Sequence, residues 1–291
     1  MSVDHFLKAH DKDLGGGFTV RRVLPAAARQ AVGPFIFFDH FGPIEAPPEA
    51  NHDVRPHPHI GLATVTYLYE GAMLHRDSLG SVQRIEPGAI NWMTAGSGIV
   101  HSERTPPDLV GKARRSHGLQ LWAALPHAHE DGAPGFAHTP AAAIPVAVFD
   151  GGDARVLIGS AFGLTSPVAT FSETLYLDIR LDAGAVLRLD DLPEEAAIYP
   201  VSGELAIDGV ALAAHTMAYL AAGSGASVSA AAGARFVVIG GAPLDGPRFI
   251  SWNFVSSSKE RLAQAADDWQ QQRYAKVPGE TEWIPLPTPR R

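Results

Sequence analysis

The chain contains no cysteine among its 291 residues. This absence excludes disulfide bonds, thiolate metal sites and cysteine nucleophiles. Long apolar segments are lacking as well. No run approaches the roughly 18 residues of a membrane-spanning helix, and the polar N-terminus shows no secretory signal. We therefore expect a cytoplasmic protein.

Positive charge is also scarce. The 23 lysines and arginines are outnumbered by 31 aspartates and glutamates, which gives a formal net charge of −8. A broad basic surface that would bind nucleic acid or an anionic membrane is therefore not expected. The hydrophobic share of 46% and the charged share of 19% suit a globular protein with one large domain or two smaller ones.

Stretches with the 3.6-residue period of a helix are rare until near the C-terminus. The 29 glycines and 23 prolines divide the chain into short β-branched and aromatic runs, a pattern typical of a β-sandwich or β-barrel. The fold class predicted from this pattern is all-β. Strands are expected at residues 18–22, 64–69, 156–159, 175–181, 204–207 and 235–239.

The segment between His127 and Pro145 is rich in alanine and proline and predicts a boundary between two domains. We place an N-terminal domain at residues 1–135 and a C-terminal domain at residues 136–291. The region from 146 to 250 repeats the short-strand pattern but contains a single histidine, His215, so no metal site is expected in the second domain.

One clear helix is predicted at residues 257–276. Ser257 followed by Glu260 forms a capping-box pattern at its start, and Pro278-Gly279 ends it. The proline-rich residues 284–291 are expected to form an extended tail laid on the surface or frayed.

Nine of the thirteen histidines lie between His52 and His138, and two pairs of side chains there have metal-ligand spacing. His57 and His59 precede a predicted strand, and His101 and Glu103 follow a glycine-rich turn. Because side chains at i and i+2 of a strand point to the same face, two neighbouring strands could close both pairs around one ion. Imidazoles with a carboxylate suit a late first-row divalent metal better than Mg²⁺ or Ca²⁺.

Two alternatives accompany this prediction. The four residues could be ordinary surface or core side chains, although the pairing of both motifs favours a metal. His127 and His129 have the same i, i+2 spacing, but Pro126 precedes them and acidic residues follow, which indicates a solvated loop. In the register of the strand that follows, His57, His59, Gly61 and Ala63 share a face, and the two small residues leave room for a ligand.

Long motifs carry a resemblance to the pirin family of the cupin superfamily, dense from about residue 35 to 126. The motifs are His57-Pro58-His59-x-Gly61, Thr64-Val65-Thr66-Tyr67-Leu68, His75-Arg76-Asp77-Ser78-Leu79-Gly80, Trp92-Met93-Thr94-Ala95-Gly96, Gly98-Ile99-Val100-His101-Ser102-Glu103 and Gly118-Leu119-Gln120-Leu121-Trp122. The resemblance implies a bicupin, with two tandem jelly-roll β-barrel domains and a C-terminal helix.

The same resemblance implies one metal ion, bound only by the first barrel. The matching ligand positions are His57, His59, His101 and Glu103. The implied metal is Fe²⁺, with Ni, Mn, Cu and Zn as alternatives. Many pirins have a glutamate where this chain has Ala63, so we expect one acid fewer beside the ion.

The resemblance further implies a quercetin 2,3-dioxygenase-like oxygenase that uses O₂ to open the central ring of a flavonol or similar chelating phenolic, with release of carbon monoxide. Glu103 would then act as a base as well as a ligand. The alternative is a metal-dependent or redox-sensing regulatory protein that modulates an unidentified partner protein without turnover. Candidate pocket walls are Phe37, His40, Met73, His75, Trp92, Met93 and Gln120.

Overall fold

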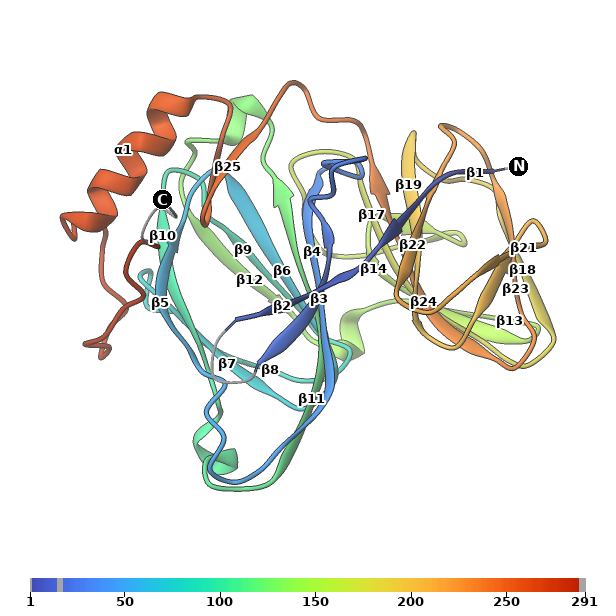
Figure 1. Cartoon of the computed structure of the whole chain (residues 1–291), viewed down its shortest axis with the longest axis horizontal. Helices are drawn as coiled ribbons and strands as arrows, with labels where there is room; N and C mark the ends of the chain where they lie inside the picture. The colour runs from blue at the N-terminus through green and yellow to red at the C-terminus, as the bar shows by residue number, and fades with distance from the viewer. Residues whose placement is uncertain (1, 15–17, 288–291) are drawn as a thin grey trace. The chain divides into compact units, whose positions relative to one another are not determined.

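The computed structural model of the chain describes residues 2–14 and 18–287, which form two compact units (Figure 1). Unit 1 comprises residues 1–12, 20–39 and 142–244, and unit 2 comprises residues 13–19, 40–141 and 245–291. Short strands bounded by turns supply nearly all regular structure, and within the described residues one α-helix lies near the C-terminus. The predicted all-β class with a C-terminal helix is confirmed.

Unit 1 contains two sheets and a small hairpin. Its strands are β1 (Val3–Lys8), β13 (Val146–Phe149), β14 (Gly152–Ile158), β15 (Ser160–Ala161), β16 (Leu164–Thr165), β17 (Thr174–Leu181), β18 (Ala185–Leu189), β19 (Glu195–Ser202), β20 (Leu205–Ile207), β21 (Val210–Leu212), β22 (Thr216–Leu220), β23 (Ala226–Ala230) and β24 (Ala234–Gly241). One sheet has the order β1-β22-β19-β24-β17-β14-β13 and the other β18-β23-β20-β21.

A large apolar cluster lies within unit 1. Leu175, Leu177 and Ile179 alternate along β17 and bury one face of the larger sheet. Leu187 of β18 and Val228 of β23 belong to the same cluster and come from the smaller sheet. Apolar faces from two sheets that meet in one core are the arrangement of a β-sandwich or jelly roll.

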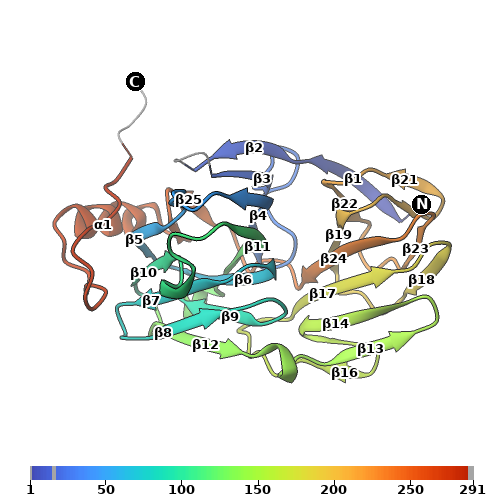
Figure 2. The same cartoon turned by 90° about the horizontal axis from the view of Figure 1, so that it is seen from below.

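Unit 2 carries the histidine motifs. Its strands and short helices are β5 (Val54–His59), β6 (Leu62–Glu70), β7 (Met73–Asp77), β8 (Val82–Ile85), β9 (Ile90–Thr94), β10 (Ile99–Arg104), η1 (Pro107–Leu109), β11 (Arg114–Ala124), η2 (His127–His129), β12 (Gly135–Thr139), β25 (Phe249–Ser251) and β26 (Phe254–Ser256). A four-stranded sheet has the order β5-β10-β7-β8 (Figure 2). A second sheet contains the order β12-β9-β6-β11-β4, in which β4 (Phe35–Ala46) begins within unit 1 residues and ends within unit 2 residues.

The remaining elements are short. They are β2 (His10–Asp13), β3 (Thr19–Leu24) and the 3₁₀ helix η3 (Ala141–Ala143).

The C-terminal helix α1 (Lys259–Gln270) is shorter than predicted, and its cap lies one residue later. Ser258 is the N-cap and accepts a hydrogen bond from the Arg261 backbone N–H. The backbone N–H and the hydroxyl of Ser257 both donate instead to the Glu130 carboxylate. The helix ends before residue 276 because Gln272 adopts a positive φ of 54°.

Helix α1 packs on the outer side of the strands that carry the histidine motifs, and both views show it beside β5 and β10 (Figures 1 and 2). Ala265 and Trp269 of the helix share one apolar cluster with Ile60 and Val100. Ile60 directly follows His59, and Val100 directly precedes His101. The helix therefore supports both motif strands from behind.

The compact units differ from the predicted boundaries at 1–135 and 136–291. At the N-terminus, β1 pairs with β22 within unit 1, so the first residues join strands that come late in the sequence. At the C-terminus, α1 packs on Ile60 and Val100, so the last 47 residues belong to unit 2. The domain boundaries predicted from the sequence could not include these assignments of the two chain ends, because both depend on contacts between residues that are far apart in the sequence.

The described part of the predicted tail is extended and anchored. Ile284 N–H donates to the Pro56 carbonyl (2.9 Å), and Trp269 Nε1–H donates to the Ile284 carbonyl (2.9 Å). The tail therefore lies against β5 at the edge of the four-stranded sheet. Residues 288–291 of the prediction lie outside the described residues.

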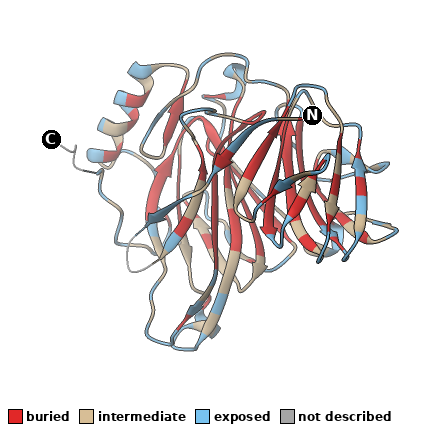
Figure 3. Cartoon of the chain, turned by 45° about the vertical axis from the view of Figure 1, so that its right-hand side comes forward, coloured by how far each residue is buried: buried red, intermediate tan, exposed pale blue. Residues whose placement is uncertain are grey.

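Buried residues follow the inner faces of the strands and one side of α1, whereas exposed residues gather in turns and on the outer side of the helix (Figure 3). Within residues 2–14 and 18–287, no helix is long and apolar enough to cross a membrane.

Candidate metal centre

Three of the predicted ligands meet inside unit 2. His57 and His59 come from β5 and His101 comes from β10, and the antiparallel pairing places His101 opposite His57. One ring nitrogen from each lies within 4.8 Å of those of the other two, and all three residues are buried. In the described part of the chain, this is the group of side chains that could hold a metal ion.

Hydrogen bonds orient two of the rings. His57 Nδ1–H donates to the Arg55 carbonyl (2.9 Å), and His59 Nδ1–H donates to the Asn253 carbonyl (3.1 Å). Because a carbonyl can only accept, both Nδ1 atoms carry the proton and both Nε2 lone pairs are available to a ligand. A backbone partner on the second ring nitrogen is the usual support of a metal-binding histidine.

His101 provides the test of whether a metal fits. Its side chain is 2% exposed, and among the described residues neither of its ring nitrogens has a hydrogen-bond partner. A buried polar atom without a partner costs free energy, which a bound cation would recover. Three converging imidazole nitrogens, one of them otherwise unpartnered, fit a divalent transition metal.

Burial also sets the protonation of the cluster. It lowers the pKa of His57 to about 4 and lowers the pKa values of His59 and His101 well below the usual value. Neighbouring imidazoles lower the pKa values of His59 and His101 further, because two charged rings would repel each other. All three rings are therefore neutral near pH 7, which is the form that binds a metal.

Glu103 lies outside the cluster of three nitrogens. The pairing of β10 with β5 shifts register between His101 and Glu103, so the simple i, i+2 alternation does not hold across that edge. Burial raises the pKa of the Glu103 carboxyl to about 7 although part of the side chain is accessible, and no described residue donates a hydrogen bond to it. Its role as a fourth ligand stays a prediction.

The prediction that Ala63 lies on the histidine face is wrong. Gly61, between β5 and β6, has a φ of 67°, which interrupts the alternation assumed from the sequence. Thr64 is directly opposite Trp122, and the Trp122 ring lies 5.2 Å from the His59 ring, so Thr64 faces the cluster. Ala63 points to the other face of β6, so the lost glutamate does not lie beside the histidines.

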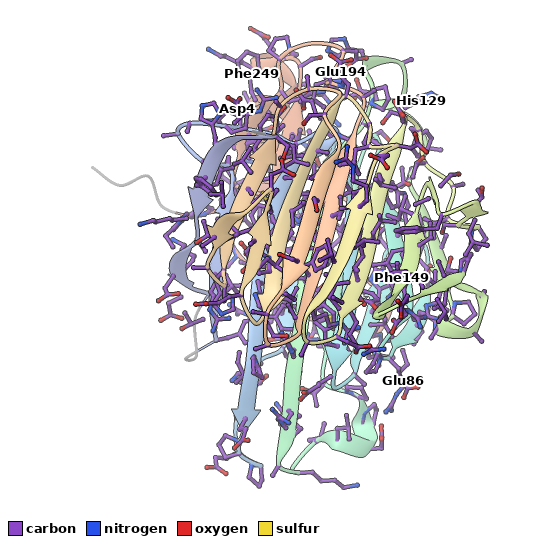
Figure 4. All side chains as sticks on the ribbon, turned by 90° about the vertical axis from the view of Figure 1, so that its right-hand side faces the viewer. Asp4, Glu86, His129, Phe149, Glu194 and Phe249 are labelled. Atoms are coloured by element: carbon purple, nitrogen blue, oxygen red, sulfur yellow. The ribbon has the colours of Figure 1, made fainter. Side chains whose placement is uncertain are left out.

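The rival pair occupies the 3₁₀ helix η2 and not a strand. His127 Nε2 receives a hydrogen bond from Arg248, and its Nδ1 lies 3.8 Å from Asp245. His129 is at the outside of the ribbon in Figure 4. Neither side chain belongs to the buried cluster.

His75 and Asp77 form a buried pair. The sequence analysis named both residues in a family motif but did not predict their pairing, although their i, i+2 spacing on β7 was a signal for it. His75 Nε2–H donates to Asp77 Oδ2 (2.9 Å). Burial raises the pKa of Asp77, but the hydrogen bonds from His75 and Ser81 outweigh it, so the net shift is downward and the carboxylate stays ionised. The pair fixes the His75 ring, whose centroid lies 5.3 Å from that of His101.

The C-terminal tail also contacts β10 at this point. Ser102 and Arg104, on either side of Glu103, both donate hydrogen bonds to the Glu280 carboxylate; the Ser102 Oγ distance is 2.6 Å. Glu280 therefore holds the segment of strand that carries Glu103. No sequence signal could have linked two segments 178 residues apart.

A small pocket opens beside Glu103. Of the seven wall residues predicted from the sequence, Met73 is the one that lines it. The full lining is Phe18, Phe41, His52, Leu68, Glu70, Ala72, Met73, Glu103, Arg104, Thr105, Arg114 and Ser116. We call this the Glu103 pocket.

The fold and the histidine cluster define a two-domain cupin protein. The family models that match are Pirin, over residues 17–123, and the Pirin C-terminal cupin domain, over residues 176–275. The chain is 44% identical over 290 residues to a pirin-like protein of Caulobacter vibrioides, with 98% of this chain and 99% of that protein covered. The chain belongs to the pirin family.

Solved structures agree with this assignment. A quercetin 2,3-dioxygenase from Acinetobacter baumannii is 33% identical, with a TM-score of 0.91 over 98% of this chain and 95% of that chain. A pirin from Escherichia coli in complex with nickel(II) shares the fold, with 18% identity and a TM-score of 0.65 over 82% of this chain and 99% of that chain.

The pH dependence of metal affinity shows whether Glu103 binds the metal in addition to the three histidines. Burial lowers the pKa of His57 to about 4 and lowers the pKa values of His59 and His101 well below the usual value, so protons compete little for these rings near neutral pH, and the decline near pH 6.5 expected for exposed histidines is not expected here. If Glu103 ligates, its proton must leave, and the metal affinity should fall about tenfold per pH unit below about pH 7. Competition titrations should show this slope in the wild type and a flat profile in Glu103→Gln. A wild-type profile that is flat over this range would exclude Glu103 as a ligand.

Glu280→Gln should weaken metal binding because it releases Ser102 and Arg104 from the tail. We expect a loss of about tenfold, the lower end of the effect of removing a supporting partner of a metal ligand. Glu282→Gln is the matched control, since Glu282 also pairs with Arg104 (2.8 Å) but has no bond to Ser102. Equal affinities for both variants, measured by competition with a chromogenic chelator, would show that the tail does not position Glu103.

Proposed function

We propose that the protein is a metal-dependent dioxygenase that opens the central ring of a flavonol or a similar chelating phenolic. The observation that carries this proposal is the buried cluster of three neutral imidazoles with the unpartnered nitrogens of His101. The similarity to the quercetin 2,3-dioxygenase of A. baumannii supports the substrate class. The balanced reaction joins a flavonol with O₂ and yields a ring-opened ester and carbon monoxide.

His57, His59 and His101 would hold the ion, with Glu103 as the fourth ligand and Fe²⁺ as the preferred metal. When bound, the metal supplies Lewis-acid and redox chemistry to a chelating phenolic and O₂. Cations of this kind also lower the pKa of a neighbouring carboxyl, which would keep Glu103 ionised.

Glu103 would be the residue that moves a proton. It lines the pocket, so a phenolic hydroxyl bound there could reach its carboxylate, and the carboxylate would accept the hydroxyl proton.

The other residues position and shield the reactants. The His75–Asp77 pair packs against His101 and restrains its ring. Phe41, Leu68 and Met73 give the pocket an apolar wall that excludes water from a bound aromatic ring.

An aerobic turnover assay tests the proposal. Protein loaded with Fe²⁺, Ni²⁺, Mn²⁺ or Cu²⁺ should consume quercetin with at least one of these metals, followed as loss of flavonol absorbance. His101→Ala removes a ligand and should lose more metal affinity than the roughly 10–100-fold cost of a supporting residue, together with turnover. The double variant His127→Ala/His129→Ala should keep both.

Absence of turnover with every metal would overturn the oxygenase and favour the regulatory alternative. If His101→Ala and the double variant His127→Ala/His129→Ala lost equal amounts of metal, measured by elemental analysis, the three-histidine cluster would not be the binding site.

A further inference from the structure

Apart from Glu103, which receives no hydrogen bond from a described residue, the charges that line the Glu103 pocket are balanced by the protein, with one exception. Glu70 pairs with Arg115 (3.2 Å). Arg104 is surrounded by carboxylates, with hydrogen bonds to Glu280 and Glu282. These two lining residues therefore have little charge left to offer a ligand.

Arg114 is the exception. Its Nη2–H donates to the Ala50 carbonyl (2.7 Å), which fixes the guanidinium in place. Among the described residues no carboxylate forms an ion pair with Arg114, although it is half-buried in the pocket wall. A positioned, partly desolvated guanidinium without a counterion favours an anion from solution.

His52 adds a neutral polar group beside this cation. Burial, then the charge of Arg114, lower the pKa of His52, so the ring is uncharged near pH 7. Its Nδ1 is buried and has no hydrogen-bond partner among the described residues. A ligand that enters beside His52 and uncovers this atom would give it a hydrogen bond, which would remove the cost of leaving it unpartnered.

The remaining wall selects the shape of a ligand. Phe18 lies 5.8 Å from Phe41 and 5.2 Å from His52, measured between ring centroids. Leu68 and Met73 complete the apolar surface. Flat rings pack well against such aromatic and thioether groups.

We propose that the Glu103 pocket binds a planar aromatic acid, with its carboxylate or phenolate on Arg114, a polar contact to His52 and its ring packed against Phe18, Phe41 and Met73. This inference deepens the proposed function and rests on it, because the same pocket would hold the substrate. It assigns Arg114 as the residue that selects an anionic over a neutral aromatic.

Binding of a matched pair of probes to the full chain tests this assignment without turnover. The probes are 2-naphthoate and its neutral analogue 2-naphthamide, titrated by calorimetry into chelator-treated, metal-free protein at about pH 7.5. Wild type should prefer the acid by about tenfold or more, the value of one charge-assisted contact. The preference should shrink as salt is raised, since the contact is partly exposed.

Arg114→Gln should reduce the preference to less than about threefold and leave the affinity for the amide unchanged, whereas Arg114→Lys should keep part of it. Arg84→Gln is the matched control: it removes one positive charge from an exposed arginine that does not line the pocket. Wild type that binds both probes equally, or neither, overturns the inference, as does a preference that survives in Arg114→Gln. If Arg114→Gln does not fold, the wild-type comparison and Arg114→Lys still decide the matter.

Failure of the two proposals can be told apart. An acid preference that depends on Arg114 in a protein without flavonol turnover would leave the inference standing and reject the dioxygenase. Turnover of a neutral flavonol in a protein that lacks the acid preference would support the dioxygenase and reject the inference about Arg114.

Discussion

The antiparallel pairing of β5 with β10 is the constraint on which the metal centre depends. It sets His101 opposite His57, and the alternation of β5 then adds His59 to the same side. Nearly all other features of unit 2 near the site maintain this pairing. Helix α1 packs behind both strands, the tail anchors the outer edge of β5, and Glu280 binds the residues on either side of Glu103.

Desolvation gives the cluster its chemical character. Three imidazoles packed together without water cannot all be charged, and burial keeps them neutral. A neutral ring with no hydrogen-bond partner is itself unfavourable, and His101 is in that state among the described residues. The same burial that stops the histidines from binding protons therefore prepares them for a metal ion, which links the packing of unit 2 to its proposed chemistry.

The sequence predicted the three histidines because strand alternation is a local rule, and the fold class because short apolar runs between turns are a local pattern. The sequence-based predictions were wrong where a single backbone angle or a contact with a distant residue determined the orientation of a side chain or the start of the helix. The positive φ of Gly61 turns Ala63 away from the histidines. Ser257 binds the distant Glu130 carboxylate, and Ser258 is the residue that caps the helix. Glu280 could not be foreseen because its partners are far away in the chain.

X-ray absorption spectroscopy at the metal edge of reconstituted protein tests the central claim most directly. The account predicts one metal per chain with the outer-shell scattering of three imidazoles, reduced to two in His101→Ala. A spectrum without imidazole scattering, or one that His101→Ala leaves unchanged while His127→Ala/His129→Ala alters it, would contradict the account.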